Sequence, residues 1–179
     1  GISFSTMLYT YVSHEVSYDS FHQKSDKTYR ILTVNKSIPH NIRTFGSTVP
    51  PIGPELVNSF PEVEAMTRLF QFSGQVVVEI GEEKYSERNW FTTEDVNFFD
   101  VFDFEFLAGD KSSALRQPFS VVLPESVAKK YFGEEGALGK TMNLQGVGVV
   151  KVTGVIKDIP GNSHLQFDLL FSKILVDEE

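Results

Sequence analysis

The 179-residue sequence has a net charge of -8, with 41% hydrophobic and 22% charged residues, sixteen phenylalanines and no cysteine. These proportions indicate a packed globular protein and exclude a disordered chain. The acidic balance argues against binding to nucleic acids or anionic membrane surfaces, which repel negative charge. The absence of cysteine excludes disulfides, thiolate metal sites and a cysteine nucleophile. No run of residues reaches the roughly 18 to 20 apolar positions that cross a bilayer.

The beginning of the chain predicts one long helix from Gly1 to about Lys24. Its first ten residues carry no charge, and apolar residues then recur at steps of three, four and seven positions. These residues would form one stripe, made of Phe4, Leu8, Tyr11, Tyr18 and Phe21. At about 1.5 Å per residue, the helix is longer than a compact domain of this size needs, so we interpret it as a stalk.

The next part of the chain predicts a short strand, helix, strand unit. Residues 29–36 are rich in strand-forming side chains and are followed by Pro39. A helix is expected from Glu55 to Phe60, because proline is tolerated in the first turn and Pro61 ends it. Residues 63–70 can form the second strand.

The remainder is predominantly β. Residues 76–80 and 85–92 flank a turn and predict a hairpin, and residues 97–107 predict a short helix that leads into an extended segment. A strand is expected at 119–123, followed by a helix from Glu125 to Phe132 that Gly133 caps. Two further strands are expected, and their alternating side chains lie at 150–157 and 165–171.

Four motifs resemble sites but lack an essential residue or have a simpler interpretation. Gly139-Lys140-Thr141 lacks the first glycine of a phosphate loop. His14-Glu15 lacks the second histidine of a zinc-protease helix, and His22 is two turns away. The segment 161–165 imitates a nucleophile elbow without its last glycine, and Asp168 is expected in water. Three acid pairs could act as acid and base but are typical of solvated turns: Glu62/Glu64, Glu82/Glu83 and Glu94/Asp95.

Five phenylalanines lie within eleven residues, at Phe98, Phe99, Phe102, Phe104 and Phe106. Such a cluster forms either part of the core or an apolar surface for a ligand or partner.

Several short sequence motifs are similar to those of one family, the extracytoplasmic core domains of MacB-like and FtsX-like ABC transporter permeases. The motifs near the beginning are Glu15-x-Ser17-Tyr18-Asp19-x-Phe21-His22, Asp26-Lys27-x-Tyr29-Arg30, Phe60-Pro61-Glu62-Val63 and Arg68. The middle contributes Phe98-Phe99-Asp100-Val101-Phe102, Gly109-Asp110, Ala114-Leu115 and Glu125-Ser126-x-Ala128-Lys129-Lys130-Tyr131-Phe132-Gly133. The end contributes Leu138-Gly139-Lys140, Val152-Thr153-Gly154-Val155 and Asp158-Ile159-Pro160-x-Asn162-Ser163-His164-Leu165-x-Phe167-Asp168.

The resemblance implies a periplasmic domain of a bacterial inner-membrane permease, placed between its first two transmembrane helices. It implies an α+β fold with a stalk helix at 1–25 that continues a transmembrane helix. A porter-like strand, helix, strand lobe would follow at 26–71, and a β-rich, sabre-like lobe at 72–172. Residues 173–179 would be a truncated end, because the family pattern continues with a second strand, helix, strand unit. We therefore expect an exposed sheet edge or apolar face near 29–36 that is available for self-association.

The function implied by the resemblance is non-catalytic, without a cofactor or metal: the domain would couple ATP-driven motion to export or to a periplasmic partner. Its partners would be the permease helices, the ATP-binding subunit or domain, a periplasmic adaptor or substrate protein, and a second copy in a homodimer. Residues expected to contact a partner or another lobe are Phe98, Phe99, Phe102, Tyr18 and Phe21. The alternatives are a soluble ligand-binding domain, which requires a closed apolar pocket, and a hydrolase, which requires close carboxylates in a cleft.

Overall fold

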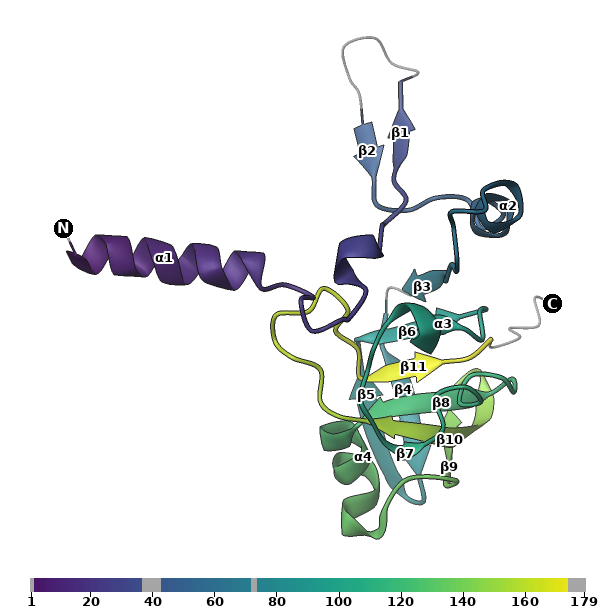
Figure 1. The fold of residues 1–179 in the computed structure, drawn as a ribbon. Helices are drawn as coiled ribbons and strands as arrows, with labels where there is room; N and C mark the ends of the chain where they lie inside the picture. Colours follow the sequence, from purple (N-terminus) through teal and green to yellow (C-terminus); the bar gives the residue numbers. More distant parts are fainter. Residues whose placement is uncertain (1, 37–42, 72–73, 174–179) are drawn as a thin grey trace.

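The computed structural model describes residues 2–36, 43–71 and 74–173 of the chain. It has the predicted α+β class, with a projecting N-terminal helix and a large mixed sheet (Figure 1). The helices are α1 Ile2–Val16, α2 Ile52–Ser59, α3 Phe98–Val101 and α4 Glu125–Phe132, with short 3₁₀ turns at Ser25–Lys27 and Gly133–Glu135. The first strands are β1 Thr33–Asn35, β2 Arg43–Phe45, β3 Leu69–Gln71, β4 Val76–Ile80, β5 Glu83–Glu87 and β6 Trp90–Thr93. The later strands are β7 Phe106–Gly109, β8 Ser120–Pro124, β9 Thr141–Leu144, β10 Gly148–Ile156 and β11 Leu169–Phe171.

Nine strands of the described chain form the large sheet, whose neighbours run in the order β3, β6, β11, β8, β10, β9, β4 and β5, with β7 also paired to β10. The pairs β8 with β10 and β6 with β11 are parallel, and the other pairs are antiparallel. All five residues of β8 are buried, because this strand lies at the centre of the sheet and is covered on both faces.

Two apolar clusters cover the opposite faces of this sheet. Val121 and Leu123 belong to the first cluster and Val122 to the second, as expected for side chains that alternate along a strand. Helix α4 packs on the first face through Val127, Ala128 and Tyr131. Helix α3 packs on the second through Phe98 and Phe99, so the phenylalanine cluster is mainly core.

Most of the predicted β-rich elements are confirmed. The predicted hairpin is present as β4 and β5, but its second arm, predicted at 85–92, is wrong as a single strand: the range divides into β5 and β6, and β6 pairs with β3 and β11. Helix α4 has the predicted bounds and ends at Gly133, whose φ of 62° suits glycine. The strand predicted at 165–171 is wrong over its first part, because only Leu169–Phe171 is β11. Gln166 instead donates to the carbonyls of Pro160 and Ser163 and holds this segment in a loop.

The segment between α1 and β3 lies above the large sheet in Figure 1. The strand predicted at 29–36 is shorter, and β1 pairs with β2 in a separate hairpin whose described residues are all exposed. Arg30 clamps the base of this hairpin by donating twice to the carbonyl of Gly46, at 3.0 and 2.7 Å. The strand predicted at 63–70 begins only at Leu69 and pairs with β6, so β1 and β3 do not share a sheet.

Apolar side chains remain exposed in this upper segment. Near the predicted strand they are Tyr29, Ile31, Leu32 and Val34. The expected apolar face near 29–36 is therefore present, and the self-association that we expect from it remains a prediction. The truncated end predicted at 173–179 lies outside the described residues, except for Lys173.

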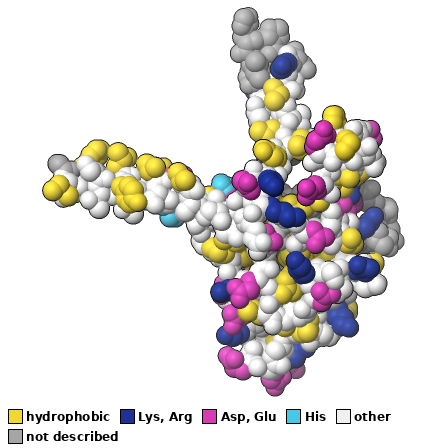
Figure 2. All heavy atoms as spheres, in the orientation of Figure 1, with side chains coloured by type: hydrophobic (Ala, Val, Ile, Leu, Met, Phe, Trp, Pro, Cys, Tyr) yellow, Lys and Arg dark blue, Asp and Glu magenta, His cyan; other side chains and the backbone are white. Residues whose placement is uncertain are grey.

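Helix α1 projects away from the rest of the domain, and hydrophobic side chains follow it in Figure 2. None of the residues from Ile2 to Val16 is buried. Ile2 and Phe4 are 87% and 70% exposed, although both are large and apolar. Such an exposed apolar surface is unfavourable in water and is typical of contact regions.

Candidate functional site

The site that the fold builds from distant parts of the chain is the place where α1 joins the body. We call it the stalk junction and define it as residues 17–23 together with 102–104 and 162–164. In Figure 1 the end of the purple helix meets the yellow-green loop that contains residues 162–164.

Helix α1 ends at Val16, and the prediction that it reaches Lys24 is wrong. Asp19 adopts a φ of 54°, a left-handed conformation that a right-handed helix cannot contain. The amide and hydroxyl of Ser17 both donate to the carbonyl of His14, at 3.1 and 2.7 Å, which closes the last turn. Tyr18 and Phe21 therefore leave the helical stripe and enter the junction.

Asp19 fastens the turn to the loop 162–164. Its amide donates to the carbonyl of Asn162 at 2.9 Å. Its carboxylate accepts from the hydroxyl and amide of the loop, at 2.7 Å from Ser163 Oγ and 3.1 Å from His164 N. The second carboxylate oxygen lies 2.6 Å from His164 Nδ1. One side chain thus joins two segments that are about 145 positions apart in sequence.

Two further contacts reinforce this side of the junction. Asn162 Nδ2 donates to both the carbonyl and the hydroxyl of Ser17, at 3.0 Å each. The Tyr18 ring packs against His164, with 4.7 Å between the centroids, and edge-on against His14 at 5.4 Å. The end of the stalk is therefore held by side chains on both sides of the turn.

His22 fastens the other side of the junction to the core. Its Nδ1 accepts from the amide of Asp103 at 3.0 Å, and the Asp103 carboxylate accepts from the amide of Gln23 at 2.9 Å. The neighbouring Phe21 ring lies 6.1 Å from that of Phe104, which belongs to the second core cluster. These contacts connect the stalk directly to the packed face of the sheet.

The electrostatics of the two anchors differ. Burial opposes ionisation of Asp19, but hydrogen bonds from Ser163 and His164 and the charge of His164 outweigh it, so the pKa of Asp19 lies below 3.8. Burial also dominates at His22, where it lowers the pKa below 6.5 despite the opposing charges of Asp19 and Asp103. Asp19 therefore acts as a carboxylate and His22 as a neutral ring near pH 7.

The predicted contact residues fall into two groups. Phe98 and Phe99 are 0% and 2% exposed, so in this structure they contact only the core. Phe102, Tyr18 and Phe21 are half-buried around the junction. Phe102 contacts both Phe98 and His22, with ring centroids 5.1 and 5.4 Å apart. Contact of these three residues with another molecule remains a prediction.

Three of the acidic residues considered for catalysis have structural surroundings. Glu94 and Asp95 are both ion-paired to Arg68, at 3.3 and 2.8 Å. Asp168, expected in water, is instead half-buried, and burial together with the charge of Glu87 raises its pKa. The described residues contain no group of three or more histidine, aspartate or glutamate side chains that could hold a metal.

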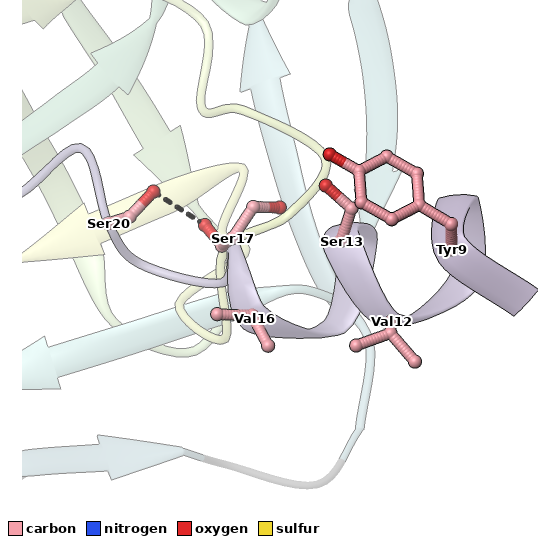
Figure 3. A pocket seen from close by; sticks show the side chains of 6 residues that line it. All are labelled: Tyr9, Val12, Ser13, Val16, Ser17 and Ser20. Atoms are coloured by element: carbon pink, nitrogen blue, oxygen red, sulfur yellow. Dashed lines mark hydrogen bonds between the residues drawn. The ribbon is translucent and has the colours of Figure 1, made fainter.

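A hollow lies along the end of α1 and the turn that follows (Figure 3). It is lined by Tyr9, Val12, Ser13, Val16, Ser17 and Ser20. All of these side chains except Ser17 are exposed, so the hollow is an open surface and differs from the closed pocket that a small-molecule binder requires.

Sequence reasoning did not identify the anchoring residues. Asp19 and Asn162 to His164 belong to the motifs that resemble the family, but in the sequence the loop residues resemble only an incomplete nucleophile elbow. No local pattern indicates that they meet Asp19, because the contact depends on the fold of the whole chain.

The sequence matches the family of MacB-like periplasmic core domains over residues 1–176. A solved domain of a permease protein from Porphyromonas gingivalis is similar, with a TM-score of 0.64 and 26% identity, over 79% of this chain and 59% of that one. The chain thus spans about 59% of the length of that structure. None of the curated protein sequences matches.

Two other solved structures are similar over shorter parts. The periplasmic region of MacB from Actinobacillus actinomycetemcomitans has a TM-score of 0.44 and 20% identity, over 65% of this chain and 54% of that one. The extracellular domain of the noncanonic ABC-type transporter YknZ from Gram-positive bacteria has a TM-score of 0.45 and 19% identity, over 66% and 60%. In the described part of the present chain, no helix combines the length and apolar character of a membrane span. The match over nearly the entire sequence shows that the chain belongs to the MacB-like periplasmic core domains, the periplasmic parts of ABC transporter permeases.

Proposed function

We propose that this domain is a non-catalytic mechanical element that carries ATP-driven motion from the membrane to a periplasmic partner or cargo. In this proposal the stalk is helix α1, Ile2–Val16, and it continues a transmembrane helix of the permease. The lobes at 26–71 and 72–172 receive the motion through the stalk junction. The driving motion would come from the ATP-binding subunit or domain of the same transporter.

The composition of α1 supports a position next to the membrane. Its side chains are exposed and largely apolar, and no charged side chain precedes Glu15. The hydroxyls of Thr6 and Thr10 donate to the carbonyls four residues earlier, at 3.0 and 2.9 Å. Polar groups satisfied within the helix in this way are compatible with apolar surroundings.

The observation that carries the proposal is the contrast between an unburied helix and a firmly bonded junction. A lever must be free along its length and fixed at the end that moves the load. Here α1 buries none of its own residues, whereas Asp19 and His22 bond the following turn to two separate segments of the body. Force applied to the helix would therefore reach the β sheet through these contacts.

The exposed apolar surface of the upper segment supports further partners. Val57 and Phe60 on and after α2 add to the exposed side chains near β1. We propose that this surface contacts a second copy in a homodimer, or a periplasmic adaptor or substrate protein. The ion-paired acids and the open hollow give no support to hydrolysis or small-molecule binding.

A flexible break in the stalk tests the proposal in the full-length permease with its ATP-binding subunit or domain. Two glycines inserted between Val16 and Ser17 separate the helix from the junction. A spin label on Val149→Cys, an exposed body residue, reports the distance between two copies of the domain. We expect this distance to differ between ATP-free and ATP-vanadate states, and the difference to disappear with the insertion while ATP hydrolysis continues.

The matched control is the same insertion between Gly81 and Glu82, in an exposed turn of the β4–β5 hairpin. This control should keep the ATP-dependent change. The proposal fails if the distance never responds to ATP, or if it responds equally with the break in the stalk.

A further inference from the structure

His22 occupies an unusual position for an ionisable side chain. It is only 4% exposed, and its ring lies 4.0 Å from Phe21, 5.4 Å from Phe102 and 5.3 Å from Phe104, measured between centroids. Its Nε2 is buried and has no hydrogen-bond partner among the residues that the structure describes. Such an unpaired polar atom costs free energy, and packing alone does not account for its burial.

The hydrogen bond from Asp103 determines where the protons of this ring reside. Because the Asp103 amide donates to Nδ1, this nitrogen carries no proton, and the neutral ring has its proton on Nε2. Protonation of the ring would place a hydrogen on Nδ1, directly against another donor. It would also place a full charge among three phenylalanine rings. The observed contact with Asp103 therefore exists only with the neutral ring.

The charged groups that face His22 come from both segments packed against it. Asp19 belongs to its own turn and Asp103 to the segment between α3 and β7, and both carboxylates favour a protonated ring. Each is already engaged: Asp19 by Ser163 and His164, and Asp103 by the amide of Gln23. Burial outweighs their attraction and lowers the pKa of His22 below 6.5.

The sign of the effect follows from this direction. A histidine whose pKa is depressed in the folded protein contributes stability above its unfolded value of 6.5. That contribution is lost as the pH falls through the folded pKa. The same fall in pH does not break the Asp19–His164 contact, because a protonated His164 forms an ion pair with the carboxylate.

We propose that His22 is a pH-sensitive latch of the stalk junction: the neutral ring holds the turn 17–23 against Phe102 and Phe104, and the protonated ring releases it. Release would loosen one side of the junction while Asp19 keeps the other attached. The regulatory meaning rests on the proposed mechanical function, since acid surroundings of the cell would then weaken transmission through the stalk.

The latch can be tested on the isolated chain, independently of any transport. The chain has four histidines, and nuclear magnetic resonance follows the protonation of each ring. We expect the pKa of His22 to lie below its ordinary value of 6.5. Because there is no native cysteine, spin labels at Val12→Cys and Val149→Cys measure the distance from stalk to body. We expect one narrow distance at about pH 7.5 and a second population at about pH 5, with the released-to-held ratio rising up to about tenfold per pH unit.

His22→Phe keeps an aromatic ring that cannot be protonated, and it should remove the pH response. Tyr11→Phe, at an exposed aromatic position of α1 outside the junction, should respond as the wild type does. The latch is disproved if the wild-type distance is the same at both pH values, if His22→Phe responds like the wild type, or if the pKa of His22 is not below 6.5. The wild-type titration and the wild-type distances together test the latch even if His22→Phe folds poorly. If the permease experiment fails but the isolated chain shows the expected low pKa and pH-dependent distance, the mechanical function is rejected and the latch remains.

Discussion

Asp19 combines an unusual backbone conformation with the anchoring of the stalk. Its φ of 54° is one of two positive values among the described non-glycine residues, and aspartate and asparagine tolerate this conformation better than most residues. The same residue accepts hydrogen bonds from Ser163 and His164. Substitutions can separate these two contributions.

We expect Asp19→Asn to lower the free energy of unfolding by about 1 kcal/mol, because the backbone preference and acceptor oxygen remain while the charge is lost. Asp19→Ala should cost about 2 to 3 kcal/mol, because the donors of Ser163 and His164 lose their partner. Urea unfolding measures both values. The pKa of Asp19 is lowered, so its stabilisation is present above 3.8 and is lost as the pH falls through the folded pKa. Equal stability of Asp19→Ala and wild type near pH 7 would contradict the anchoring role.

The pKa of Asp168 is shifted in the opposite direction to that of Asp19. Burial and the nearby charge of Glu87 raise its pKa, so the folded chain holds this proton more tightly than the unfolded chain. As the pH rises above 3.8, ionisation of Asp168 lowers the stability of the folded chain. The loss is complete once the pH exceeds the folded pKa, and it persists at neutral pH. Asp168→Asn should raise the free energy of unfolding at neutral pH by up to about 1 kcal/mol, and the gain should vanish in acid. Asp100→Asn, at an exposed position, should change it by less than about 0.5 kcal/mol at either pH.

The upper segment is tied to the large sheet near the start of β3. The amide of Arg68 donates to Asp95 at 2.6 Å, and its guanidinium donates to both oxygens of the same carboxylate, at 3.1 and 2.8 Å. This two-oxygen geometry is specific to arginine. It connects the residue before β3 to the loop after β6, in addition to the ladder between these strands.

Arg68→Lys should therefore lower the free energy of unfolding by about 1 to 2 kcal/mol. Lysine keeps the positive charge but cannot donate to both carboxylate oxygens of Asp95 as the planar guanidinium does. Lys157→Gln provides the comparison, since its ion pair with Glu105 is exposed on both sides and should contribute less than about 0.5 kcal/mol. Chemical unfolding of the two variants measures the difference. A smaller loss for Arg68→Lys than for Lys157→Gln would contradict this account.

Elements were predictable where local sequence signals agree. Helix α4 follows from an apolar face bounded by Pro124 and Gly133, and its predicted bounds are those observed. The excess length predicted for α1 arose because Tyr18 and Phe21 continue the helical period, although tertiary contacts at Asp19 turn the chain there. The alternation at 165–171 was equally misleading: in β11 all three residues are buried, since both faces of the sheet are covered.

The arrangement of the whole domain depends on contacts that no local pattern encodes. The α+β class is implied by the resemblance to the family, and the apolar periodicity at the start of the chain predicts a projecting helix. In contrast, the stalk junction joins residues about 145 positions apart. The pairing of β3 with β6 likewise places the end of the upper segment in the large sheet. The division into lobes at 26–71 and 72–172 remains a prediction. Deletions at the N-terminus test whether α1 contributes to the stability of the rest of the domain.

Removal of residues 1–16 should leave the free energy of unfolding of the remaining chain within about 0.5 kcal/mol of the full chain, because α1 buries none of its own residues. Removal of residues 1–24 also deletes Asp19 and His22 and exposes the core rings that they cover, so it should cost at least about 2 kcal/mol. Urea unfolding of the two shortened chains, followed through the fluorescence of Trp90, separates these outcomes. If loss of the helix alone were as costly as loss of the junction, α1 would be part of the packed body, and it could not act as a free lever.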